Sequence, residues 1–190
     1  MCVTMAADLS TTYFELFGLP PAFAVDMAQL DSHYRELQRT AHPDRFANAS
    51  DQERRISMQQ ATQINAGYQV LKDPLRRGRY LLELGDYRFD DGQHTNKDVE
   101  FLMEQMELRE SLSEVREADD AFAALGIIMD RIAGDNERLI AVLHRQFAAA
   151  DPDDNKCSDC IAETLTKMQF FHKLQEEAME LEVTLEDEIG

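Results

Sequence analysis

Apolar residues in the first half of the chain recur at three- and four-residue spacings, which is the pattern of amphipathic helices. One such stripe consists of Leu30, Tyr34, Leu37 and Ala41, and a later one consists of Ile64, Tyr68 and Leu71. Pro43 disfavours helical backbone angles at His42 and therefore ends the first long helix, while Asp73-Pro74 ends the second. The pattern predicts a hairpin of two long helices, with short helices before and after it over about 13–17 and 75–84.

Capping signals mark the starts of these helices. Asp26 with Gln29, and Ser50 with Glu53, have the spacing of a capping box, whose side chains satisfy free backbone amides. Gly18 follows the first short helix, where a left-handed residue would end it. No stretch shows a convincing two-residue alternation of a half-buried strand, so the expected fold class is all-α.

One predicted helix in the second half carries two apolar surfaces. At about 100° per residue, its inner face consists of Phe101, Leu108, Leu112 and Val115. Its nearly opposite face holds Met103 and Met106, with Leu102 between the two faces, and beside the methionines lie Glu107, Glu110 and Glu114. The helix is either buried on more than one side or carries an exposed patch, and the cost of burying unpaired carboxylates favours the patch. An exposed Leu/Met patch rimmed with acid indicates a protein-binding site.

Two more long helices are predicted after it. The stripe of the next helix consists of Phe122, Leu125, Met129, Ile132, Leu139, Leu143 and Phe147. One face of the last helix consists of Ile161, Leu165, Met168 and Met179, and Phe170 points away from that face, although its neighbours Phe171 and Leu174 also allow a place in the core. An antiparallel three-helix bundle is the simplest packing for these segments.

The net charge differs strongly between the two halves of the chain. The 190 residues include 19 Lys+Arg and 37 Asp+Glu, for a net charge of −18. Residues 1–90 hold 10 basic and 12 acidic side chains, whereas residues 91–190 hold 9 and 25. This imbalance predicts two domains, over 8–85 and 97–190, with a connector over 86–96. The acidity argues against nucleic acid and anionic membranes as partners, because both attract positive charge.

Several features bear on the compartment. No apolar run approaches the roughly 20 residues of a membrane span, and the first basic residue is Arg35, which leaves the start without the basic region of a signal or transit peptide. The three cysteines are an odd number, which fits free thiols in a reducing compartment. The expected location is the cytoplasm.

The predicted hairpin turn displays His42 and Asp44, which allow a catalytic pair, two metal ligands or a polar turn. No nucleophile or further ligand lies nearby in the sequence. Beside them, a basic face carries Arg35, Arg39 and Arg45, which suits docking onto an acidic protein surface.

The first half resembles a J domain. The segment Tyr13-Phe14-Glu15-Leu16-Phe17-Gly18-Leu19, the basic second helix and the tripeptide His42-Pro43-Asp44 follow in the order of that family. The resemblance implies binding to a DnaK-like ATPase chaperone and stimulation of its ATP hydrolysis through His42, Pro43 and Asp44, with Arg35, Arg39 and Arg45 on the binding face. No phosphate-binding loop is present, so the hydrolysis belongs to the partner and the chain is not expected to be an enzyme.

The second half is similar to the HscB-type co-chaperones of iron–sulfur cluster assembly, above all at residues 101–110, with Gln93-His94-Thr95 as lead-in. The resemblance implies an HscA-type chaperone and an IscU-type cluster scaffold as partners. The scaffold-binding residues it implies are Leu102, Met103, Met106, Glu107, Glu110, Glu114 and Phe170. Met106 replaces a leucine that is common in the family, and this exchange conserves volume.

Two other functions stay open. One is a J-domain adaptor for a different client. The other is a redox or metal protein that uses Cys157 and Cys160, although one Cys-x-x-Cys pair alone cannot complete a tetrahedral metal site. No histidine follows a glutamate by three residues, as a helical di-metal carboxylate site would need. We therefore expect neither a cofactor nor a bound metal.

Overall fold

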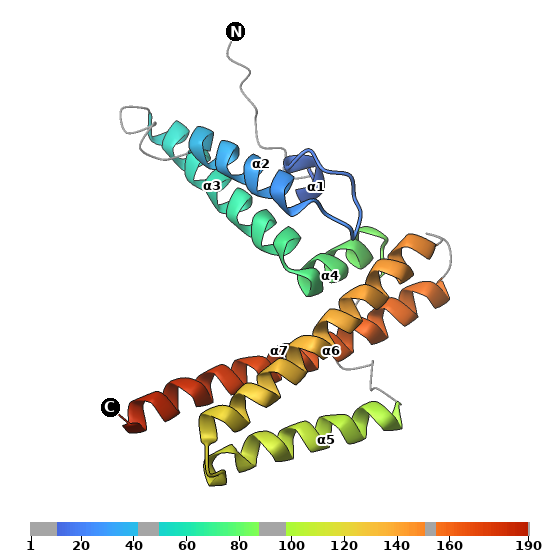
Figure 1. The fold of residues 1–190 in the computed structure, drawn as a ribbon. Coiled ribbons are helices and arrows are strands. Elements are labelled where there is room, and N and C mark those ends of the chain that lie inside the picture. The colour runs from blue at the N-terminus through green and yellow to red at the C-terminus, as the bar shows by residue number, and fades with distance from the viewer. Residues whose placement is uncertain (1–10, 42–49, 88–97, 151–154, 190) are drawn as a thin grey trace. The chain divides into compact units, whose positions relative to one another are not determined.

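The computed structural model describes residues 11–41, 50–87, 98–150 and 155–189 (Figure 1). Every regular element within these ranges is helical, which confirms the all-α prediction. The chain divides into two compact units, Met1–Leu81 and Leu82–Gly190. The elements in chain order are α1 (Tyr13–Leu16), α2 (Met27–Ala41), α3 (Asp51–Lys72), α4 (Pro74–Leu84), α5 (Val99–Glu114), the 3-10 turn η2 (Val115–Glu117), α6 (Ala121–Ala149) and α7 (Asn155–Ile189).

Helices α2 and α3 start at the predicted caps, and α1 starts at a further capping box. Thr12 and Glu15 form a capping box at α1, and Ser50 and Glu53 form one at α3. The carboxylate of Asp26 accepts hydrogen bonds from the backbone N–H groups of Ala28 and Gln29 at 2.9 and 3.1 Å, and so caps α2. Gly18 has a φ of 60°, the left-handed conformation predicted for the end of α1.

The α2–α3 hairpin forms the body of this unit, and α1 packs against α3 (Figure 1). The core consists of Phe14, Phe17, Leu19, Leu30, Ala41, Ile64 and Leu71, most of them predicted from the helical stripes. Gly67 permits the close approach of α1. A Cβ atom at Gly67 would lie 2.7 Å from Tyr13 Cδ1 and 3.0 Å from Phe17 Cε2, so only glycine lets these rings rest on the backbone of α3.

A buried arginine secures the turn between α3 and α4. The Arg77 guanidinium donates a hydrogen bond to the carbonyl of Leu71 at 2.6 Å, and its central carbon lies 4.9 Å from the centroid of the Phe23 ring. Burial lowers the pKa of Arg77 from its usual value. This side chain satisfies a carbonyl in the last turn of α3 and covers the loop before α2.

The second unit consists of the long α6–α7 pair with α5 along one side of it (Figure 1). Its core includes three residues of the predicted inner face, Phe101 and Leu108 of α5 and Val115 of η2. The other members are Leu125, Ile128, Ile132, Phe171, Leu174, Ala178 and Leu185. The carboxylate of Asp120 caps α6 by accepting a hydrogen bond from the backbone N–H of Ala123. Helix α6 continues through Gly134. Tyr87 belongs to this unit as well, because its hydroxyl donates to Asp159 at 2.7 Å.

Two residues predicted on inward-facing stripes lie on the surface instead. Phe122 is 38 % exposed and Met179 is 52 % exposed. Buried positions of α7 recur every seven residues, at Thr164, Phe171, Ala178 and Leu185, which is the spacing of helices that supercoil around each other. A straight helix drifts by about 20° per heptad relative to this repeat. A straight-helix pattern extended over the 18 residues from Ile161 therefore predicts burial at Met179, whereas the buried residue is its neighbour Ala178.

Candidate protein-binding surfaces

The outer side of α2 is the first candidate surface. Arg35 and Arg39 are both exposed and are one helical turn apart. The opposite side of α2 is attached to α3 by stacked rings of Tyr34 and Tyr68, whose centroids are 3.9 Å apart. The Tyr68 hydroxyl donates to Asp31 at 2.8 Å, and this hydrogen bond raises the pKa of Tyr68. These contacts fix the rotation of α2, which keeps its basic side turned to solvent.

The end of α2 is also anchored. Ser57 is buried, and its hydroxyl donates to the carbonyl of Ala41 at 2.9 Å, which ties the last residue of α2 to α3. The predicted chaperone-binding residues His42, Pro43, Asp44 and Arg45 follow directly and lie outside the described residues. The structure therefore describes the basic helix α2 and its anchored last residue, Ala41, which directly precedes these predicted residues.

The second candidate surface is on α5, whose start is fixed by Asp98. The Asp98 carboxylate accepts a hydrogen bond from the backbone N–H of Phe101 at 3.1 Å and forms an ion pair with Lys167 of α7 at 2.6 Å. The hydrogen bond from Lys167, followed by that from Phe101, lowers the pKa of Asp98. The Lys167 ammonium also lies 5.1 Å from the Phe101 ring centroid. This group of contacts sets the register of α5 against α7, which determines the side chains that face outward.

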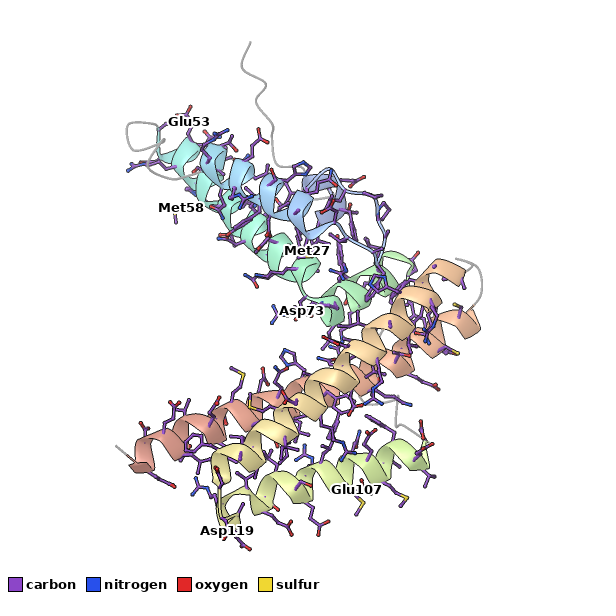
Figure 2. All side chains as sticks on the ribbon, viewed as in Figure 1. Met27, Glu53, Met58, Asp73, Glu107 and Asp119 are labelled. Atoms are coloured by element: carbon purple, nitrogen blue, oxygen red, sulfur yellow. The ribbon has the colours of Figure 1, made fainter. Side chains whose placement is uncertain are left out.

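The outer side of α5 displays a strongly exposed apolar patch. Leu102, Met103 and Met106 are 41, 60 and 72 % exposed, although the inner face of the same helix already fills the core. Glu107, Glu110 and Glu114 are exposed as well. Figure 2 marks Glu107 on α5, where sulfur-bearing side chains project from the outer side of the helix. We call Leu102, Met103, Met106, Glu107, Glu110 and Glu114 the α5 face.

Phe170 occupies the seam between α5 and α7. Its ring is half-buried and meets Phe101 and Phe171 edge-on, with centroids 5.8 and 5.4 Å apart. The Arg109 guanidinium lies 5.7 Å from the Phe170 centroid, and Arg109 forms an ion pair with Glu177 at 3.5 Å. The ring thus contributes to the core with one part and remains accessible with the rest.

Two arginines near the α5 face were not predicted from the sequence. Arg109 covers Phe170, as described above, and Arg131 of α6 lies 3.5 Å from Glu104 and 3.8 Å from Glu107. Arg109 lies within the segment 101–110 that carries the family resemblance, so the sequence contained a signal that could have singled it out. Arg131 is 24 residues beyond Glu107 in the chain, and no sequence pattern links the two.

The remaining chemistry is limited in the part of the chain that the structure describes. Cys157 is half-buried and Cys160 is exposed, both as free thiols. Among the described residues, no group of three or more His, Cys, Asp or Glu side chains is arranged to hold a metal ion. None of the helices in the described ranges combines the length and apolar character needed to cross a membrane.

The described residues form an all-helical protein of two compact units, each with one candidate protein-binding surface. Residues 97–179 match the family model described as the HSCB C-terminal oligomerisation domain. The chain is 41 % identical to the co-chaperone protein HscB homologue of Shewanella oneidensis over 175 residues, which cover 92 % of this chain and 99 % of the relative. It is also 41 % identical to the HscB homologue of Colwellia psychrerythraea over 177 residues, 93 % of this chain and 99 % of that one. The chain belongs to the HscB family of co-chaperones.

Solved structures of the family have the same fold. The chaperone HscB from Vibrio cholerae is 40 % identical, with a TM-score of 0.78 over 92 % of this chain and 99 % of the other. Human co-chaperone protein HscB is 30 % identical, with a TM-score of 0.82 over 93 % of this chain and 85 % of the other.

Proposed function

We propose that this protein stimulates ATP hydrolysis by an HscA-type, DnaK-like chaperone and delivers an IscU-type iron–sulfur cluster scaffold to it. The observation that carries the proposal is the similarity to HscB co-chaperones at about 40 % identity over more than nine-tenths of the chain. Two separate compact units, each with its own candidate surface, support the division into a chaperone-binding and a scaffold-binding part. The proposed boundaries are 8–85 for the J domain, 86–96 for the connector and 97–190 for the scaffold-binding domain.

The J domain engages the ATPase through His42, Pro43 and Asp44, and the basic residues Arg35, Arg39 and Arg45 steer the encounter. The exposure of Arg35 and Arg39 on a helix held firmly by α3 supports this role. Complementary charge raises the association rate and selects the orientation of a partner, so these residues bias docking toward an acidic surface of the chaperone.

The α5 face binds the scaffold, with Phe170 at its margin. Exposed methionines beside carboxylates fit an apolar partner surface with a basic rim. Binding one partner on each unit raises the effective concentration of the scaffold at the chaperone, commonly into the millimolar range for short linkers. A weak chaperone-binding segment of the scaffold is then captured more readily, and the ATP is consumed by the chaperone.

Steady-state ATP hydrolysis by the HscA-type chaperone tests the proposal, with this protein and the scaffold added separately and together. We expect stimulation by this protein, synergy with the scaffold, and loss of both with His42→Gln while scaffold binding is unchanged. A His42→Gln variant as active as the wild type would contradict the role of the tripeptide. Stimulation without scaffold synergy would contradict delivery of the scaffold and leave only the J-domain activity.

A further inference from the structure

A second exposed apolar surface lies on the second unit, and the pairing of α6 with α7 assembles it. Arg116, just before α6, forms an ion pair with Glu188 at 3.1 Å, and Gln146 near the end of α6 donates to the carbonyl of Cys160 at 3.2 Å. The two helices run antiparallel, so residues that lie side by side have residue numbers with a constant sum. In both contacts this sum is about 305. The same register places Phe122 of α6 level with Val183 of α7, and Gly126 level with Met179.

The rotation of both helices places these residues away from α5. Phe122 is nine residues before Arg131, whose side chain reaches Glu104 and Glu107 of α5, and nine residues correspond to about half a rotation. Met179 is likewise nine residues after Phe170, which contacts α5. Val183 follows Met179 by one helical turn. Phe122, Met179 and Val183 therefore share the side of the α6–α7 pair that is opposite α5, and we call them the α6–α7 face.

The side chains of this face are open to solvent. Phe122, Met179 and Val183 are 38, 52 and 58 % exposed. At Gly126, level with Met179, no atom of the described residues beyond the adjoining helix backbone lies within 4 Å of the place where a Cβ would stand, so the helix backbone is accessible there. Exposed aromatic, methionine and branched side chains across two neighbouring helices form a surface on which an apolar ridge can rest.

The charge around the α6–α7 face has one sign. Residues 117–130 contain four acidic and no basic side chains, and residues 174–190 contain seven acidic and no basic side chains. The nearest arginine before this segment, Arg116, is already paired with Glu188. Asp119, labelled in Figure 2, marks the acidic end of the unit. This charge repels a second copy of the same face as well as anionic lipid or nucleic acid, and attracts cations.

We propose that the α6–α7 face is a docking site for an amphipathic helix of another protein, with aliphatic or aromatic residues on one side and Lys or Arg along its edges. The apolar side chains contact the ridge of the helix, and the surrounding carboxylates pair with its basic edges. The site lies opposite the α5 face, so a partner can bind while the scaffold is held. It is separate from the scaffold-binding role and does not depend on it.

The test titrates the full chain with three labelled 18-residue peptides. Fluorescence anisotropy measures the affinity for each peptide, and the shifts of the protein's amide NMR signals locate the binding site. The first peptide places Leu at helical spacing with Lys elsewhere, the second has the same composition in scrambled order, and the third replaces Lys by Glu. All titrations use the Met103→Ser/Met106→Ser background, which removes both methionines of the α5 face. Met179→Ser/Val183→Ser is then added, and Ile127→Ser is the matched control, because Ile127 is 71 % exposed on another side of α6.

We expect the ordered Leu/Lys peptide to bind and to shift amides within 119–130 and 175–187. Met179→Ser/Val183→Ser should weaken binding by about tenfold or more, as the loss of two buried apolar side chains implies, while Ile127→Ser changes affinity less than twofold. Equal binding of the scrambled peptide, unchanged affinity of the Met179/Val183 variant, or shifts spread over all acidic helices would overturn the proposal. So would a wild-type dimer that dissociates in this variant, because the occupant would then be a second copy. Circular dichroism confirms that each variant keeps its helix content.

Discussion

The proposed role of Met103 and Met106 in scaffold binding can be tested separately from folding, because both lie on the outer side of a helix whose inner side fills the core. They are 60 and 72 % exposed, whereas Leu108 on the same helix is 1 % exposed. Fully burying a methionine side chain contributes about 1.5–3 kcal/mol. Since roughly two-thirds of each side chain is still exposed in the free protein, a bound scaffold can gain about 1–2 kcal/mol from each.

Replacing both with alanine should therefore weaken scaffold binding by about 2–4 kcal/mol, or roughly 30- to 1,000-fold in Kd. Isothermal titration calorimetry with the purified scaffold measures this loss, and thermal unfolding should show a stability close to that of the wild type. The contrasting variant Leu108→Ala should lower stability by about 2–5 kcal/mol, because it leaves a cavity in the core. A correctly folded Met103→Ala/Met106→Ala protein whose Kd changes less than threefold would refute the role of the α5 face.

Two more substitutions probe the J domain. Arg35→Glu/Arg39→Glu should weaken binding to the HscA-type chaperone roughly three- to tenfold at low salt, since each exposed ion pair contributes about 0.2–1 kcal/mol. The loss should shrink in about 0.5 M salt, where charges are screened, and a loss of equal size at both salt concentrations would exclude electrostatic steering. Gly67→Ala should destabilise the first unit by about 1 kcal/mol, because overpacking of about 1–3 kcal/mol exceeds the gain of about 1 kcal/mol in helix propensity. Hydrogen exchange should show faster opening of amides within 13–81 and unchanged exchange in α6 and α7. Slower opening in the first unit would contradict the prediction, because it would mean that the rings of Tyr13 and Phe17 accommodate a Cβ without strain.

Local patterns predicted most of the helices. Ser50 and Glu53 form the capping box that begins α3, and Pro74 begins α4 two residues after α3 ends at Lys72. These features depend on residues three or four apart, so their physical cause is present within the segment itself. The same holds for the two sides of α5, because helical periodicity alone separates Leu108 from Met106.

Positions that depend on helix pairing were beyond a local pattern. The stripe prediction was wrong for Met179 because buried positions of α7 recur every seven residues, the spacing of supercoiling helices, and Ala178 takes the core position. It was wrong for Phe122 because the neighbouring Ala121 is the residue of α6 that packs against the core. Phe170 was left between core and surface by its neighbours in the sequence. The half-buried position between Phe101 and Arg109 depends on how α5 packs against α7.

The sequence by itself determined the all-helical fold class, the capped starts of α2 and α3 and the outer face of α5, since each follows from interactions within a few turns of one helix. The tertiary structure decided which distant side chains meet. It brought Lys167 to Asp98, Arg131 to Glu107, and Arg116 to Glu188. Such contacts depend on the register and rotation of whole helices, which are selected by the packing of all core side chains together and not by any short segment.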